Sequence, residues 1–243
     1  MKIEVFFSRD DLPSEVPKNF RDSTAVVIDV LRASTTIIQA ISFGARKIFV
    51  VKTPEDAFSL RENLEESVLL CGERDGLIIP GFDLGNSPLD YTEENIGNET
   101  LIYCSTNGSA TLLACQFARK VLIGGFVNLN ALIEKIRDDE RVFLVCSGKL
   151  GRFSLEDALC AGMIIEQLSA GGFKPELLSD SAITSYWLFE RYLSNPDETL
   201  ANAEHAVYLS RDLGLAEDVA FCTRVGIFDL VPVFSRGIIE GQV

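Results

Sequence analysis

The spacing of hydrophobic and polar residues along the chain predicts short buried strands separated by helices. Continuous apolar runs bounded by turn residues are typical of parallel strands that are covered on both faces. The predicted strands are residues 2–7, 25–28, 48–51, 68–71, 101–104, 121–124, 142–146 and 228–234. Strands that alternate with helices in this way indicate βαβ units and a largely parallel sheet.

Helical segments lie between these strands and continue after the seventh of them. The predicted helices are residues 33–43, a helix opened at 53–55, a helix that ends at 118, then 128–137, 154–170, 181–193, and helices around 196–209 and 215–221. Thr53 is a good N-cap followed by proline in the first turn, and Ser154 precedes Asp157 by three residues, close to a capping box. Residues 72–98 have little helical periodicity, and such a long irregular stretch is more often functional than filler.

The order of elements predicts two similar βαβαβ units within one compact α/β domain of residues 1–243. Two lobes, residues 1–99 and 100–243, are the alternative division. The tripeptide Ala-Arg-Lys occurs at residues 45–47 and again at 118–120, each time before a predicted strand. Because parallel crossovers are right-handed, each unit is expected to form a parallel sheet with covering helices. The predicted architecture is a three-layer α/β/α fold with a largely parallel sheet.

Small polar residues follow three of the strands, where ligands usually bind in α/β sheets. These loops are residues 29–36, 105–109 and 147–157, and segment 72–88 adds charged and amide groups. Converging hydroxyl and N–H donors at helix N-termini suit a tetrahedral anion such as phosphate or sulfonate. Asp29 and Arg32 could hold a metal ion and an anion together, whereas a local interpretation makes Ser34 only a helix cap. Neither G-x-x-x-x-G-K-[ST] nor G-x-G-x-x-G occurs, so a nucleotide fingerprint is absent.

Charge and composition narrow the classes of partner. The formal net charge of -14 argues against nucleic acid, because no basic stripe could cover phosphates in such a field. No apolar run is long enough to cross a membrane, and the start of the chain does not resemble a signal peptide. The six cysteines lack C-x-x-C spacing, which argues against a disulfide framework. Cys71, Cys104 and Cys146 each end an apolar strand, which indicates buried thiols in a reducing compartment and favours the cytoplasm. His205, the only histidine, is predicted on the surface and Trp187 in the core.

A cysteine-dependent phosphatase is one alternative interpretation. Cys146 and Arg152 have the C-x5-R spacing in which a thiolate attacks phosphorus while an arginine and loop amides hold the oxygens. Cys146, however, ends an apolar strand, is preceded by Val145 rather than histidine, and Arg152 is followed by Phe153 rather than serine or threonine. The metal-assisted route is therefore preferred.

Three blocks of the sequence closely resemble the 2-phosphosulfolactate phosphatase family. They are V-I-D-V-L-R-A-S-T-T (27–36), G-E-R-D-G-L-I-I-P-G-F-D-L-G-N-S-P (72–88) and S-G-K-L-G-R-F-S-L-E-D-A-L-C-A-G (147–162), and S-T-N-G-S (105–109) is similar to the family's T-N-G-T block. The resemblance implies a magnesium-dependent enzyme that hydrolyses 2-phosphosulfolactate to sulfolactate and phosphate in coenzyme M biosynthesis. One departure is Ser109-Ala110, where family members often have threonine and arginine. Without that arginine one contact to the anion is lost, which leaves the exact substrate open.

With this resemblance the candidate residues take specific roles. The expected catalytic residues are Asp29, Arg32, Glu73, Asp83 and Asp157, with Asp29, Asp157 and Glu73 as ligands of Mg²⁺. The expected substrate-binding residues are Ser34, Thr35, Arg74, Asn86, Ser105, Thr106, Asn107, Gly108, Ser109, Ser147 and Gly148. Water is the expected attacking group, because D-x-D-x-T is not met at Asp29. A non-catalytic binder of a small phosphorylated or sulfonated acid is the other alternative, and the oligomeric state is left open between a monomer and a homo-oligomer.

Overall fold

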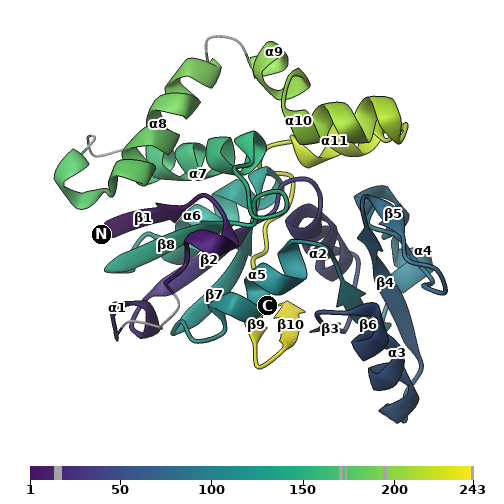
Figure 1. The fold of residues 1–243 in the computed structure, drawn as a ribbon. Helices are drawn as coiled ribbons and strands as arrows, with labels where there is room; N and C mark the ends of the chain where they lie inside the picture. Colours follow the sequence, from purple (N-terminus) through teal and green to yellow (C-terminus); the bar gives the residue numbers. More distant parts are fainter. Residues whose placement is uncertain (14–17, 170–171, 173, 194–195, 242–243) are drawn as a thin grey trace.

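The computed structural model describes residues 1–13, 18–169, 172, 174–193 and 196–241, and these contain one mixed sheet (Figure 1). Its strand order is β1-β8-β2-β7-β9-β10-β3-β6-β4-β5. The strands are β1 (Lys2–Phe6), β2 (Thr24–Ile28), β3 (Lys47–Val50), β4 (Val68–Arg74), β5 (Leu77–Ile78), β6 (Thr100–Cys104), β7 (Lys120–Gly124), β8 (Arg141–Cys146), β9 (Pro232–Ser235) and β10 (Ile238–Gly241). The predicted α/β class with a mostly parallel sheet is confirmed.

The sheet consists of two parallel blocks joined by a C-terminal hairpin. β1, β8, β2 and β7 are mutually parallel, as are β3, β6 and β4. β9 pairs antiparallel with β7, and β10 pairs antiparallel with β3, so the yellow hairpin in Figure 1 links the blocks. Arg236 and Gly237 between these strands both have positive φ, as a tight hairpin turn requires. The single strand predicted at 228–234 is therefore wrong in its bounds, and β10 was not predicted.

The two predicted βαβαβ units do not form a sheet each. β6 lies between β3 and β4, and β2 lies between β8 and β7. Residues 1–99 and 100–243 thus supply strands to both blocks, and their backbones are joined by ladder hydrogen bonds. The expectation of one sheet per unit is wrong because strands distant in sequence pair with each other in preference to their neighbours along the chain.

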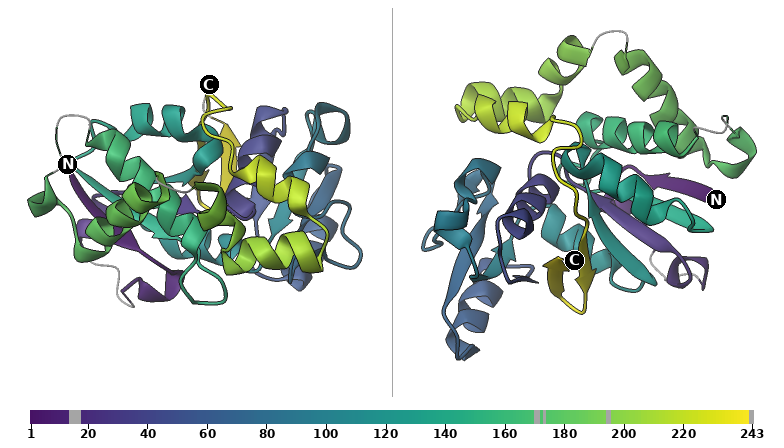
Figure 2. Two further views of the ribbon diagram at one scale, coloured as in Figure 1. Left: turned by 90° about the horizontal axis from the view of Figure 1, so that it is seen from above. Right: turned by 180° about the vertical axis from the view of Figure 1, so that it is seen from behind.

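Helices cover the faces of both blocks and fill the space between them (Figure 2). The helices are α1 (Lys18–Arg21), α2 (Ala33–Ser42), α3 (Pro54–Asn63), α4 (Glu93–Ile96), α5 (Gly108–Cys115), α6 (Leu129–Ile136), α7 (Leu155–Leu168), α8 (Asp180–Leu193), α9 (Pro196–Ala201), α10 (Glu204–Val207), the π-helical turn η5 (Tyr208–Asp212) and α11 (Ala216–Cys222). All residues from Ala33 to Ile41 are buried, so α2 is covered on every side. An α-helix enclosed in this way has a fixed N-terminus, and that end lies at the candidate site described below.

Two expectations about the outer helices are corrected by the packing. Trp187 is 60% exposed rather than in the core, because α8 buries Ala182, Ser185 and Phe189. These residues face α7, where a Cβ at Gly162 would lie 2.1 Å from the Ser185 carbonyl oxygen, so only glycine permits the close contact. The predicted helix 196–209 is divided into α9, α10 and the start of η5.

All six cysteines are free and buried, which confirms the burial predicted for Cys71, Cys104 and Cys146. Within the part of the chain that the structure describes, no helix has both the length and the apolar character needed to span a membrane.

Candidate active site

A pocket of about 220 Å³ is lined by residues from the ends of several strands. The loops that follow β2, β6 and β8 contribute Asp29, Thr106 and Lys149, and Glu73 comes from the last turn-side residues of β4. The carboxyl ends of strands in the two blocks therefore open on the same cavity. In α/β sheets this is where ligands bind.

Asp29 lies at the floor of the pocket, 8% exposed, at the end of β2. Its Oδ1 accepts a hydrogen bond from the Ala33 N–H (3.2 Å), the first residue of α2. Burial raises the pKa of the Asp29 carboxyl to about 6; His205 and the Ala33 N–H oppose the shift, and the charges of Glu73 and Glu156 add to it. The ionised form of this carboxyl is destabilised by burial, and a nearby cation would stabilise it.

Gly108 allows α5 to approach Asp29. A Cβ at Gly108 would lie 2.6 Å from the Ala33 Cβ and 2.9 Å from the Asp29 Oδ2. Both distances are shorter than real Cβ contacts, so the N-termini of α2 and α5 meet at this carboxylate only because position 108 has no side chain.

Arg32 is 3% exposed, and its guanidinium is held in place by two groups. Its Nη1 donates to Asp218 Oδ2 (2.5 Å), and its Nη2 donates to the Gly76 carbonyl oxygen (2.7 Å). Ser87 Oγ donates to the other Asp218 oxygen (2.8 Å), so the segment predicted to be functional does contact this pair. Asp218 was not predicted, because an acid in a short helix near the C-terminus gives no local signal of burial.

Glu73 joins two loops that line the pocket. Its Oε1 accepts from the Thr106 N–H (2.7 Å), and its Oε2 accepts from the Gly76 N–H (2.8 Å) and the Thr106 hydroxyl (3.2 Å). Asp75 and Gly76 both have positive φ in the tight turn between β4 and β5. Glu73 therefore fixes both the loop that follows β6 and the turn that contacts Arg32.

Two amide side chains also line the pocket. Asn86 is 5% exposed, and its Oδ1 accepts a hydrogen bond from the Tyr103 hydroxyl. Its backbone carbonyl accepts from the Thr36 hydroxyl (2.9 Å). Asn107 accepts from the Leu150 N–H through Oδ1 (3.2 Å), which connects the loops after β6 and β8. Both predicted residues are thus brought to the cavity.

The outer wall of the pocket comes from α10 and η5, which the sequence did not associate with the site. His205 was expected on the surface, but its side chain is only 18% exposed and lines the cavity. Its Nδ1 lies 3.5 Å from Oε1 of Glu156, a residue of α7 that is 2% exposed. Tyr208 and Lys149 complete this wall. His205 is the only histidine in the sequence, and this was the signal by which the sequence could have indicated a functional role for it.

Asp157 lies behind the pocket, and it is not among the lining residues. Its Oδ1 accepts from the Val30 N–H (2.8 Å) and its Oδ2 from the Gly148 N–H (3.2 Å). Burial and the charge of Asp29 raise the pKa of Asp157 well above its usual value. The residue joins the loops after β2 and β8. Ser147 is buried beside Gly148, and its hydroxyl has no hydrogen-bond partner in the described residues.

Arg74 and Asp83 are placed outside the pocket. Successive strand residues point to opposite faces, so Arg74 cannot follow Glu73 into the cavity. Its guanidinium donates to the carbonyl oxygens of Glu73 and Lys52 (2.9 Å each). Asp83 is exposed, and its Oδ2 accepts from the Leu70 N–H (2.8 Å) at the edge of β4. The expected direct roles of these two residues find no support in this geometry.

Four predicted hydroxyl residues make hydrogen bonds within their own loops and do not line the pocket. Ser34 lies inside α2 and is not its N-cap, which is Arg32, but its Oγ accepts from the Asp29 N–H (3.0 Å), so its role is local. Thr35 Oγ1 donates to the Val30 carbonyl oxygen (3.1 Å). Ser105 and Ser109 bind each other's N–H groups at 2.9 and 3.0 Å. These residues shape the loops that carry Asp29, Thr106 and Asn107.

The cysteine-dependent alternative conflicts with the structure. Cys146 is fully buried, and burial raises the pKa of its thiol well above the usual value. Arg152 is exposed, and its backbone closes a turn with Lys149. A nucleophilic cysteine needs an accessible thiolate with a lowered pKa, so Cys146 is unsuited to attack phosphorus.

The expected set of three carboxylate ligands does not form one cluster. Among the described residues, no group of three or more His, Cys, Asp and Glu side chains is arranged to hold a metal ion. Asp29 and Glu73 nevertheless both line the pocket. One or two carboxylates are typical for Mg²⁺, which takes its other ligands from phosphate oxygens and water. The residues present therefore fit a magnesium ion that binds together with a phosphate ester.

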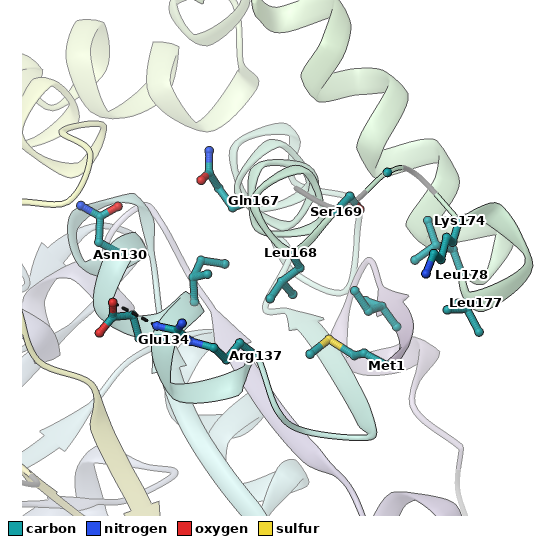
Figure 3. Close-up of a pocket in the computed structure, with 13 residues that line it drawn as sticks. Met1, Asn130, Glu134, Arg137, Gln167, Leu168, Ser169, Lys174, Leu177 and Leu178 are labelled. Carbon is teal, nitrogen blue, oxygen red and sulfur yellow. Dashed lines mark ion pairs between the residues drawn. The ribbon is translucent and has the colours of Figure 1, made fainter.

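A second, larger hollow of about 640 Å³ lies elsewhere on the molecule (Figure 3). Met1 and Ile3 at the start of β1 line it together with residues of α6, α7 and the segment before α8. It includes an exposed ion pair between Glu134 and Arg137 (3.1 Å). None of the predicted site residues lines this hollow, so the smaller pocket is the candidate active site.

Comparison with known proteins agrees with the geometry. The model of a family described as 2-phosphosulpholactate phosphatase matches residues 10–237. A probable 2-phosphosulfolactate phosphatase of Carboxydothermus hydrogenoformans is 42% identical over 236 residues, 96% of this chain and 92% of that protein. Proteins with the same printed name from Thermotoga petrophila and Caldicellulosiruptor saccharolyticus are 40% and 38% identical, over 88% and 99% of this chain and 90% and 99% of their own lengths. The chain therefore belongs to the 2-phosphosulpholactate phosphatase family.

Proposed function

We propose that this chain is a magnesium-dependent phosphatase that hydrolyses 2-phosphosulfolactate to sulfolactate and phosphate, the step in coenzyme M biosynthesis that the family resemblance implies. The observation that carries the proposal is the convergence of Asp29, Arg32, Glu73 and Thr106 on one small pocket at the strand ends. Relatives named as probable 2-phosphosulfolactate phosphatases cover nearly the whole chain and support the choice of substrate.

The charges around the pocket support a cation as part of the reacting complex. Asp29, Glu73 and Asp75 line the cavity, while the positive charge of Arg32 is already offset by Asp218. A substrate with phosphate, carboxylate and sulfonate groups would bring further negative charge to this place. Like charges that meet in a poorly solvated site repel strongly. A magnesium ion held by Asp29 and Glu73 would offset this charge and, when bound, would polarise the phosphoryl group.

The protein groups then have separate tasks. Arg32 is held by Asp218 and Gly76 and therefore presents a fixed positive charge to the phosphoryl oxygens. The helix α5 begins at Gly108, beside Asp29, so the positive end of its dipole lies at the site, although the Ser109 N–H already donates to Ser105 Oγ. Asn86 and Asn107 offer amide groups to the remaining polar atoms of the ester. These preorganised donors stabilise charge that increases in the transition state.

Water rather than Asp29 attacks phosphorus in this proposal. Asp29 Oδ1 is bound to the Ala33 N–H, and Leu31 and Ala33 occupy the places of the second aspartate and the threonine in D-x-D-x-T. Trapping of a phosphoaspartate at Asp29 would contradict this route.

The test is phosphate release from a panel of phosphorylated 2-hydroxy acids, with and without sulfonate and carboxylate groups, in magnesium and in EDTA. We expect release from 2-phosphosulfolactate that depends on Mg²⁺. Asp29→Asn is expected to reduce turnover by at least about 100-fold, as is usual when a metal ligand or a transition-state contact is removed. A non-catalytic binder would release no phosphate from any ester and would retain ligand affinity in Asp29→Asn.

A further inference from the structure

We propose that Lys149 binds the sulfonate group of the substrate and thereby selects sulfonated over unsulfonated phosphoesters. The inference rests on the proposed function, and it assigns one residue to one end of the ligand. It is carried by the position of Lys149 on the outer wall of the pocket and by its weakly held counterion.

The backbone places Lys149 firmly. Its N–H donates to the Arg152 carbonyl oxygen and its own carbonyl accepts from the Arg152 N–H, both at 3.0 Å. Gly148, Leu150 and Gly151 within this turn all have positive φ. The Gly148 N–H binds Asp157 and the Leu150 N–H binds Asn107, so the turn is fixed on both sides. Because the loop is already fixed, no loop ordering is needed when Lys149 binds a ligand.

The side chain is directed along the wall of the pocket by an aromatic ring. Lys149 Nζ lies 4.9 Å from the centroid of the Tyr208 ring, a cation–π distance. The Tyr208 hydroxyl donates to the Asp75 carbonyl oxygen (2.9 Å), which ties η5 to the turn after β4. The ammonium group is thus held beside the cavity and only 23% of the side chain is exposed.

The three basic side chains that line the pocket differ in how strongly their partners hold them. Arg32 is paired with Asp218, which is 3% exposed, and His205 lies against Glu156, which is 2% exposed. Lys149 lies 3.5 Å from Oε1 of Glu204, whose side chain is 83% exposed. An ion pair to so exposed a carboxylate contributes little free energy. An incoming anion can therefore replace Glu204, while the partners of Arg32 and His205 stay in place.

The burial of the lining residues separates two ends of the pocket. Asp29 and Arg32 are 8% and 3% exposed and form its inner end. Lys149 and the 67% exposed Leu150 form its mouth. With the phosphoryl group at the inner end, the sulfonate of a three-carbon ester extends toward the mouth. A sulfonate is a permanent tetrahedral anion without a proton of its own, and an ammonium group supplies the three donors that match it.

The experiment compares 2-phosphosulfolactate with 2-phospholactate, which lacks only the sulfonate, in the intact protein with Mg²⁺. Lys149→Met is expected to lower the ratio of kcat/KM for the sulfonated to the unsulfonated ester by about 10- to 100-fold, the range for one charge-assisted hydrogen bond. Lys149→Arg is expected to restore most of the ratio. Lys52→Met, which changes an exposed lysine outside the pocket, serves as the matched control and is expected to leave both activities unchanged.

Glu204→Gln tests the role of Lys149 independently, and its expected effect is opposite in direction to that of Lys149→Met. With its weakly competing carboxylate removed, Lys149 should bind sulfonate slightly more tightly, so the KM for 2-phosphosulfolactate falls by about two-fold while the KM for 2-phospholactate does not change. An equal loss on both esters in Lys149→Met would overturn the assignment of Lys149 and leave the phosphatase proposal intact. Absence of phosphate release from both esters in the unmodified protein would overturn the proposed function, and the inference with it.

Discussion

Removal of Asp218 should strongly destabilise the protein, because it leaves the Arg32 guanidinium buried without its counterion. Arg32 and Asp218 side chains are 3% and 4% exposed and are joined at 2.5 Å. Breaking a buried pair by removing one partner costs about 3–5 kcal/mol. For a chain of this size, each kcal/mol corresponds to about 2–4 °C in Tm. Asp218→Ala should therefore lower Tm by roughly 6–20 °C.

A double-mutant cycle measured by urea unfolding separates the energy of the Arg32–Asp218 ion pair from that of a general packing defect. Arg32→Met combined with Asp218→Leu replaces the pair by apolar groups, and it should be more stable than either single variant. Glu134→Ala is the matched control, because its partner Arg137 is exposed and the pair contributes at most about 0.5 kcal/mol. Phosphate release by Asp218→Asn, measured below its Tm, should fall because Arg32 loses its fixed position. A free energy of unfolding of Asp218→Ala within about 1 kcal/mol of that of the unmodified protein would refute the role of Asp218 as the essential counterion of Arg32.

Three further predictions follow from the site. Gly108→Ala should reduce kcat and lower the free energy of unfolding by about 1–3 kcal/mol, since its Cβ would lie 2.6 Å from the Ala33 Cβ. Gly125→Ala, whose Cβ meets only contacts of 3.8 Å or more, is the control and should leave kcat unchanged. Urea unfolding and initial rates measure the two effects. Cys146 should resist iodoacetamide in the native protein because burial raises its thiol pKa, and mass spectrometry showing rapid labelling with loss of activity would contradict this. Asp83→Asn should retain phosphate release within about two-fold, because the Asp83 carboxylate bonds the Leu70 N–H outside the pocket, whereas Glu73→Gln should lose most of it. Equal losses in the rate assay would place Asp83 at the site.

Local signals in the sequence identified the elements that carry the inner end of the pocket. The apolar run before Asp29 predicted β2, and the hydroxyl-rich segment after it predicted α2 with the correct start at Ala33. Thr53 and Ser154 accept hydrogen bonds from the N–H groups of Asp56 and Asp157, as their capping patterns predicted. These features depend on interactions within a few residues, so a local pattern contains the information for them.

Strand alternation could also have separated Glu73 from Arg74. The two residues are consecutive on β4, so one faces the pocket and the other faces away. The prediction placed both at the substrate because it treated segment 72–88 as an irregular loop, whereas β4 continues to Arg74. A strand that continues to Arg74 is compatible with the sequence, but Gly72 was interpreted as the start of a loop.

The chain by itself therefore determined the α/β class, most strand and helix positions, and the loops after β2, β4, β6 and β8 that surround the pocket. Only the tertiary structure decided the strand order, the pairing of Arg32 with Asp218 and the placement of His205 and Lys149 on one wall. The physical reason is range: caps and periodicity act over a few residues, whereas these contacts join segments far apart in sequence. Their partners are selected by burial and charge compensation, which exist only after the two parallel blocks and their covering helices have packed.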